Sequence, residues 1–331
     1  MLFRSSNMYY NRTISKELAS LLEKSGELRW LFDFVKNHSE LDFLIGKNNS
    51  KEWISVYRGL TRIVSISKSK KSTIQISGAG KYENLVPNLY GRKQKNENFQ
   101  KGIELLINQI EQDRSFDRYY NNMKEGYYQN ELSRKYGIYG SPDSAFVIID
   151  KETVIGYKDT AEKNDIFGSI QHKYKLIQKL ISQENPKRYG KDLESKAIGN
   201  ELDFLALDKA GNILLIEYKH GNNTSGIYLS PLQIGLYFDI FTKYPKPDLE
   251  SAVLEMLEQK KKTGLINPDW KVPDTIKEII PVLIISEYDE KSSAKVKFDE
   301  ILQFTRDQVG LGFLSNLRTF NFTMKNGLSD W

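Results

Sequence analysis

The chain has no cysteine and only three histidines among its 331 residues. Without thiols it can form neither disulfides nor thiolate metal centres, and so few histidines disfavour a zinc cluster. No stretch approaches the roughly 18 uninterrupted apolar residues of a membrane span, and the opening MLFRSSNMYYN lacks the pattern of a signal peptide. These absences predict a cytoplasmic protein without a membrane partner.

The composition indicates a folded chain, since 39% of its residues are hydrophobic and 12% are aromatic. Its length predicts about two domains, each large enough to bury a core. We place them at residues 1–160, as an α+β accessory domain, and at residues 161–331, as an α/β domain. The net charge of +5 is compatible with a nucleic-acid partner but does not demonstrate one, because many soluble proteins are equally basic.

Residues 201–219, ELDFLALDKAGNILLIEYK, form the most informative segment. Two apolar runs, 202–207 and 213–218, are separated by the turn residues DKAGN, a pattern that predicts an antiparallel hairpin. Because neither run alternates with polar residues, we expect both strands to be buried on both faces.

Two carboxyl groups of this hairpin are expected to face each other. If Leu207 pairs with Ile213, strand alternation places Asp203 opposite Glu217 and puts Lys219 on the same face. Facing buried carboxylates cost several kcal/mol without compensation, which a divalent cation such as Mg²⁺ supplies. The alternative is a charged strand end exposed to solvent, which the flanking apolar runs disfavour.

This pattern resembles the PD-(D/E)xK nuclease superfamily. Asp203, Glu217 and Lys219 match its three core positions, although Leu202 stands where the family usually has proline. Acid-x-lysine triplets are frequent by chance, so the resemblance rests on the hairpin around them. It implies a restriction-endonuclease-like core, a mixed central sheet flanked by helices. It further implies that Asp203, Glu217 and the carbonyl of Tyr218 bind Mg²⁺, with Mn²⁺ as a substitute, and that Lys219 acts on the attacking water.

Two further features extend the resemblance. A helix predicted at 187–198 and closed by Gly199 carries Glu194, which matches an accessory acid in many members; Glu201 competes for that role, and a solvated Glu194 is an equal alternative. Ser230 and Pro231 are interpreted as the start of a second helix. Gln233 and Tyr237 lie four apart on it and match the Q-x-x-x-Y motif of the RecB-type branch, where both help to set the active site and the nucleic-acid strand. A tyrosine on such a helix is otherwise a core residue. Further helices are expected at 249–262 and 292–308, and strands at 278–286 and 317–323.

The first half of the chain is less informative. We expect helices at 14–24, 28–35 and 102–113, a loop at 84–98, and strands at 53–67 and 73–77 joined by a basic tip. The tip and its surroundings form a candidate DNA-binding face, although charged tips are ordinarily solvated turns: Tyr57, Arg58, Arg62, Lys68, Lys70, Lys71, Tyr82 and Tyr90. Residues 142–158 imitate the acidic hairpin with Gly156 in place of the second acid, and we interpret them as a chance likeness in preference to an inactive copy.

Together these features predict a Mg²⁺-dependent deoxyribonuclease acting on DNA, with a bacterial restriction or phage-defence endonuclease as the natural setting. A repair or recombination exonuclease is one alternative, to which the Q-x-x-x-Y spacing points. A non-catalytic nucleic-acid-binding protein on the same fold is another, which the intact set of two acids and a lysine disfavours. The sequence leaves the oligomeric state open, including a homodimer.

Overall fold

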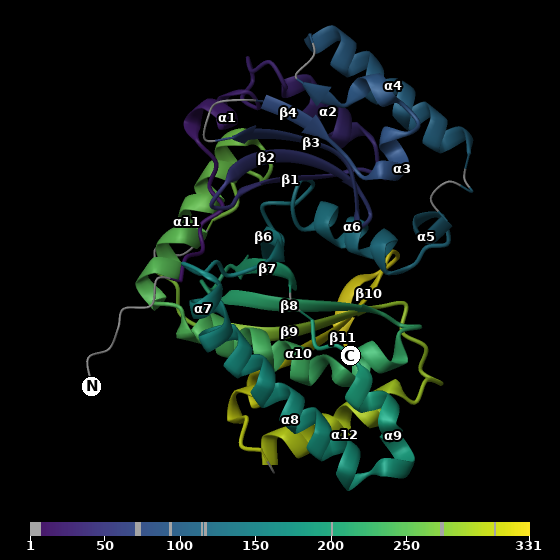
Figure 1. Cartoon of the computed structure of the whole chain (residues 1–331), viewed down its shortest axis with the longest axis vertical. Helices are drawn as coiled ribbons and strands as arrows, with labels where there is room; N and C mark the ends of the chain where they lie inside the picture. Colours follow the sequence, from purple (N-terminus) through teal and green to yellow (C-terminus); the bar gives the residue numbers. More distant parts are fainter. Residues whose placement is uncertain are drawn as a thin grey trace. The chain divides into compact units, whose positions relative to one another are not determined.

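A computed structural model describes residues 8–69, 74–92, 95–113, 115, 118–199, 201–271, 275–307 and 309–331. The protein is a mixed α/β structure with two sheets (Figure 1). It divides into two compact units: unit 1 comprises Met1–Tyr10, Asp150–Glu250 and Val272–Trp331, and unit 2 comprises Asn11–Ile149 and Ser251–Lys271. Their segments alternate along the chain and do not coincide with the ranges 1–160 and 161–331, which stay a prediction.

Unit 2 contains an antiparallel sheet whose strands follow the order of the sequence. Its strands are β1 (Asp42–Lys47), β2 (Lys51–Arg58), β3 (Thr61–Ser69), β4 (Ile74–Ser77) and β5 (Gly91–Arg92). The single strand expected at 53–67 is in fact two, because the chain reverses at Gly59, whose φ of +60° glycine adopts without steric cost. The sequence pattern did not predict β1.

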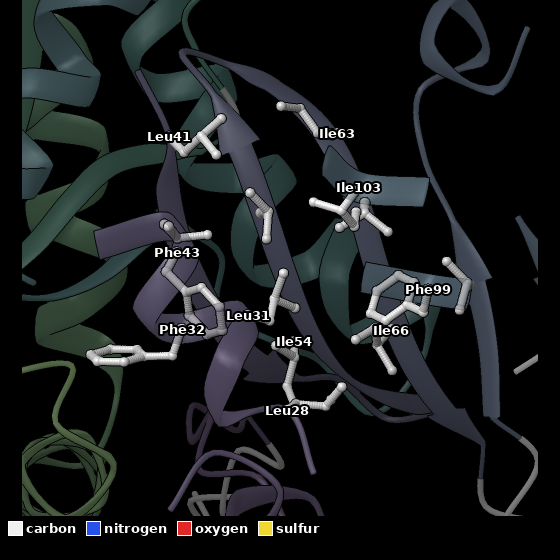
Figure 2. Close-up of a cluster of buried hydrophobic side chains, with 14 of the residues drawn as sticks. Leu28, Leu31, Phe32, Leu41, Phe43, Ile54, Ile63, Ile66, Phe99 and Ile103 are labelled. Atoms are coloured by element: carbon white, nitrogen blue, oxygen red, sulfur yellow. The ribbon is translucent and has the colours of Figure 1, made fainter. Parts of the chain in front are cut away.

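The sheet of unit 2 is packed into an apolar core (Figure 2). Leu31 and Phe32 of α2 (Arg29–Asn37) and Phe99 and Ile103 of α4 (Asn96–Gln112) belong to one buried cluster with Ile54 of β2. The expected loop 84–98 holds a 3₁₀ turn, β5 and the start of α4. The helical elements of the segment before β6 are α1 (Lys16–Ser20), α2 (Arg29–Asn37), α3 (Gly80–Glu83), η1 (Pro87–Leu89), α4 (Asn96–Gln112), α5 (Arg118–Asn121) and α6 (Glu125–Lys135).

Two residues of the expected DNA-binding face are buried. Arg58 is only 3% exposed, and its guanidinium donates to the carboxylate of Glu40 at 2.9 and 3.0 Å. Tyr82 is fully buried in the core. The predicted DNA-binding face is therefore wrong for Arg58 and Tyr82, because both side chains lie in the interior of unit 2. Lys70 and Lys71 of the expected tip lie outside the described residues.

The second sheet is mixed and runs in the order β11-β10-β9-β8-β7-β6. Its central strand β9 is parallel to both β8 and β10, while β7 and β11 are antiparallel to their neighbours β8 and β10. The strands are β6 (Phe146–Thr153), β7 (Leu202–Asp208), β8 (Ile213–His220), β9 (Ile279–Ser286), β10 (Arg318–Thr323) and β11 (Gly327–Asp330). This sheet confirms the α/β class, and β11 was not predicted.

Helix α10 (Thr224–Lys243) contacts β8 and β9 of the sheet and the helices α8 (Ser169–Glu184) and α12 (Ala294–Asp307). The remaining helical elements are α7 (Thr160–Lys163), the π-helical turn η2 (Asn164–Gly168), α9 (Pro186–Ser195), α11 (Lys246–Thr263) and η3 (Gly312–Asn316). In the described part of the chain, no helix combines the length and apolarity needed to span a membrane.

Helix α10 begins earlier than the sequence predicted. The side chain of Asn223 caps it by accepting the N–H of Gly226 at 3.0 Å, and Pro231 lies inside the helix. Proline has no N–H to offer the carbonyl of Ile227, and the hydroxyl of Ser230 donates to that carbonyl instead, at 2.7 Å. The helix start assigned to Ser230 and Pro231 is wrong because this local hydrogen bond offsets the missing donor.

Two other expectations also fail. Helix α9 ends at Ser195 and not at Gly199, because the chain is already extended at Lys196. The supposed second hairpin at 142–158 does not form: β6 is one continuous strand, and Gly156 makes only an isolated bridge with Tyr9. Both errors come from interpreting glycine and turn residues locally, without the segments that pack on them.

Candidate functional site

The candidate site lies at the end of the β7–β8 hairpin. Leu207 pairs with Ile213 as predicted, and the register continues to Phe204 opposite Ile216. Asp203 and Glu217 are the next residues along these two strands. Because β8 is also paired with β9 on its other edge, every residue of β8 is buried, including Glu217 and Lys219. The hairpin thus carries charged side chains into the interior of unit 1.

The ammonium of Lys219 lies among three oxygen atoms. It donates to Glu217 Oε1 and to the carbonyl of Tyr218, the latter at 2.9 Å, and lies 3.8 Å from Asp203 Oδ2. The strand alternation that the sequence predicted therefore brings these side chains together. Two carboxylates share one ammonium, so the cluster attracts further positive charge.

The two carboxylates differ in exposure. The side chain of Glu217 is 3% exposed, whereas that of Asp203 is 23% exposed. Asp203 Oδ2 also accepts the backbone N–H of Tyr218 at 2.8 Å, which fixes the carboxylate against β8. Solvent therefore reaches the cluster from the side of Asp203.

Gln233 and Tyr237 of α10 lie on one face of the helix, as predicted, and both contact the chain that leads into β7. A Cβ on Gly199 would be 2.7 Å from the hydroxyl of Tyr237 and 3.1 Å from Nε2 of Gln233, so a side chain there would require these two residues to shift. The hydroxyl of Tyr237 donates to the carbonyl of Glu201. The hydrogen bond from Tyr237 holds the start of β7. Direct contact of Gln233 or Tyr237 with substrate stays a prediction.

The hydroxyl of Tyr237 is held in its protonated form. Burial raises the pKa of Tyr237, and the nearby carboxylates of Glu217, Asp203 and Glu201 raise it further. A neutral phenol donates a hydrogen bond but supplies no base. Tyr237 is therefore suited to positioning and not to proton abstraction.

The two candidate accessory acids, Glu194 and Glu201, make no side-chain hydrogen bond or salt bridge with the cluster around Lys219 in the described part of the chain. Glu194 is exposed near the end of α9 and forms no hydrogen bond or salt bridge with the described residues. Glu201 is exposed as well, and it takes part through its backbone carbonyl. A role for either carboxylate stays a prediction. His220 accepts the N–H of Asn222 on Nδ1 at 3.2 Å, which holds the turn after β8.

The oxygen atoms around Lys219 suit a hard divalent cation. Among the described residues, no three His, Cys, Asp or Glu side chains form a metal-binding group. Mg²⁺, however, typically takes one or two protein carboxylates and completes its shell with waters and phosphate oxygens. Asp203, Glu217 and the Tyr218 carbonyl already converge on one cation, the lysine ammonium. The residues present therefore fit Mg²⁺ in their chemistry.

Gly199 is the residue that sequence reasoning misplaced. It was interpreted as a helix terminator, but the structure uses its missing side chain to admit Gln233 and Tyr237. The spacing of Gln233 and Tyr237 along α10 could have indicated that this helix face packs closely against another segment. Nothing in the sequence indicates that this segment is the one around Gly199.

No protein-family model, no curated protein and no solved structure matches the chain.

Proposed function

We propose that the protein is a Mg²⁺-dependent nuclease that hydrolyses phosphodiester bonds in DNA. The observation that carries this proposal is the position of the Lys219 ammonium among Asp203, Glu217 and the Tyr218 carbonyl at the solvent-accessible end of a buried hairpin. A buried ion pair such as Glu217 with Lys219 is often no more stable than apolar side chains of similar volume, so its presence favours a functional reason.

Each residue has a distinct part. Asp203, Glu217 and the carbonyl of Tyr218 would hold Mg²⁺, which when bound polarises the phosphodiester and lowers the pKa of water. Lys219 shares its oxygen partners with that cation, and its flexible side chain can turn from Glu217 towards the phosphate. There its ammonium orients the attacking water and neutralises charge that develops on the phosphate. The hydrogen bond from Tyr237 holds the start of β7, and with it Asp203, in place.

The biological setting that we propose is a bacterial restriction or phage-defence endonuclease, since unit 2 offers a second body that can select the substrate. An exonuclease of repair or recombination would use the same chemistry. The two differ in their need for a DNA end, which makes covalently closed DNA the discriminating substrate.

The test is incubation of the full chain with supercoiled, linear and single-stranded DNA, with and without Mg²⁺. We expect Mg²⁺-dependent cleavage of at least one substrate, and cleavage of supercoiled DNA if the enzyme is an endonuclease. Glu217→Gln should lose activity, while Lys179→Ala, at an exposed lysine of α8, should keep it.

Three results would count against the proposal. Cleavage that survives Glu217→Gln would move the chemistry elsewhere, and cleavage without a divalent cation would remove Mg²⁺ from the mechanism. DNA binding by the wild type without cleavage under any condition would favour the non-catalytic alternative.

A further inference from the structure

Unit 1 contains a cavity of about 330 Å³ that is separate from the candidate active site. Ile213, the first residue of β8, lines it, together with Phe238 of α10 and Leu249 of α11. Glu217 lies four residues further along β8, which corresponds to about 13 Å at the rise of a β-strand. The cavity and the acidic cluster therefore lie at opposite ends of the same strand.

One side of the cavity is apolar and well supported, although the polar Thr242 and Asn316 also line the cavity. Ile213 and Leu249 are each 1% exposed, so their side chains are held by the core of unit 1. Phe238 stacks on Phe313 with ring centroids 4.1 Å apart and nearly parallel planes. These contacts keep the wall in place whether or not a ligand is present, which favours binding of an apolar group.

The mouth of the cavity carries more positive than negative charge. Lys246 and Lys277 line it with exposed side chains, against the single carboxylate of Glu278. Lys246 Nζ donates to the backbone carbonyl of Lys277 at 3.1 Å, and neither lysine forms a salt bridge with a described residue. Since a carbonyl leaves the ammonium charge unbalanced, the mouth attracts an anion.

The backbone at the mouth is fixed by the sheet. The N–H of Lys277 donates to the carbonyl of Gly211 at 2.9 Å, and the carbonyl of Glu278 accepts the N–H of Ile213 at 2.8 Å. The segment that carries Lys277 is therefore tied to the β7–β8 turn. This fixes the main chain that carries Lys277 next to Ile213.

We propose that this cavity binds a small amphipathic monoanion, such as an aromatic or short aliphatic carboxylate. Its apolar body packs on Ile213, Phe238 and Leu249, and its carboxylate faces Lys246 and Lys277. The volume is near the lower end for ligand pockets, which selects a small molecule. The proposal does not depend on the nuclease activity, because the cavity and the acidic cluster share no residue.

The experiment is isothermal titration of the full chain with 2-naphthoate, and with the neutral 2-naphthylmethanol and the cationic 2-naphthylmethylammonium as matched probes. The naphthoate should bind about tenfold more tightly than the alcohol, equivalent to about 1.4 kcal/mol, and the ammonium probe most weakly. In the double variant Lys246→Gln/Lys277→Gln the preference for the naphthoate should disappear. Lys243→Gln, at an exposed lysine of α10 outside the cavity, should behave as the wild type.

The proposal is overturned if 2-naphthoate does not bind, if the three probes bind alike, or if the double variant keeps the preference. Should the double variant fail to fold, the ranking of the three probes on the wild type still decides between these outcomes.

Discussion

The two units each bury a cation, and they surround it differently. In unit 2, Arg134 is 4% exposed and donates to the carbonyls of Val35 and Lys36 at 3.1 and 3.2 Å, and to that of Leu41. In unit 1, Lys219 is 7% exposed and lies between the carboxylates of Glu217 and Asp203. Arg134 donates to three backbone carbonyls, whereas Lys219 donates to one backbone carbonyl and lies beside two carboxylates.

The difference separates a structural role from a functional one. At the end of α2 the carbonyl of Val35 accepts the N–H of His38 at 3.2 Å, and Arg134 adds a second donor. Arg134 also donates to the carbonyl of Lys36, so it stabilises a helix end, a role that folding alone explains. Folding alone does not explain why two carboxylates lie beside a lysine within a sheet, because apolar side chains there would be at least as stable. We therefore expect the cluster around Lys219 to be required for activity and Arg134 for stability.

The largest effect that this contrast predicts is on catalysis. Lys219→Met keeps the length of the side chain and removes its charge, so cleavage should fall by a factor on the order of 10² or more. Mg²⁺ should still bind, because its oxygen ligands remain. Initial rates at saturating Mg²⁺, with metal binding measured in parallel, check this, and a wild-type rate would remove Lys219 from the mechanism.

The next effect concerns the metal. Mg²⁺ at about one hundred times its Kd should stabilise the wild type by about 2.7 kcal/mol, seen as a rise in melting temperature. Asp203→Ala should abolish that rise because it removes the more exposed of the two carboxylates. Asp165→Ala, at an exposed aspartate of the same unit, is the control and should keep it. Full stabilisation in Asp203→Ala would place the metal elsewhere.

The third prediction tests the other side of the comparison. Arg134→Met should lower the stability of the protein by about 2 kcal/mol, because the carbonyls of Val35, Lys36 and Leu41 lose the guanidinium donor. The cleavage rate per folded molecule should not change. Urea unfolding measures the first quantity, and Lys135→Met at the exposed neighbouring lysine serves as control. A loss of activity with unchanged stability would contradict the division of roles.

The smallest effect concerns Glu131, close to Arg134 in unit 2. Burial raises the pKa of Glu131; Arg134 and Asn130 oppose the shift, and Asp42 adds to it. The folded state therefore holds this proton to higher pH than the unfolded chain. The contribution of Glu131 to stability is full below its ordinary pKa and declines as the pH rises through the raised value.

Glu131→Gln should remove this decline. The variant should gain less than about 1 kcal/mol over the wild type at neutral pH, because the half-buried carboxyl is partly screened by solvent, and nothing in acid. Unfolding measured at acidic and at neutral pH gives the comparison. An equal gain at both would assign the effect to the amide and not to the charge.

Sequence reasoning succeeded where the relevant contacts are local. The pairing of Leu207 with Ile213 follows from a short turn between apolar runs, and Glu217 and Lys219 share a face because side chains alternate along a strand. It failed at Pro231, where the hydroxyl of Ser230 compensates for the missing N–H, and at Arg58, whose exposure depends on Glu40. One side-chain hydrogen bond at Pro231 and two at Arg58 outweigh the usual preference of the residue.

The sequence by itself determined the hairpin and the grouping of Asp203, Glu217 and Lys219, because β alternation and turn chemistry act over a few residues. Only the tertiary structure decided that Asp203 is the accessible acid and that Gly199 admits Tyr237, 38 residues further along the chain. It also decided that the start of β8 meets α10 and α11 around a cavity. Packing between segments far apart in the sequence sets such features, and no local sequence pattern indicates which distant segment will pack against a given residue.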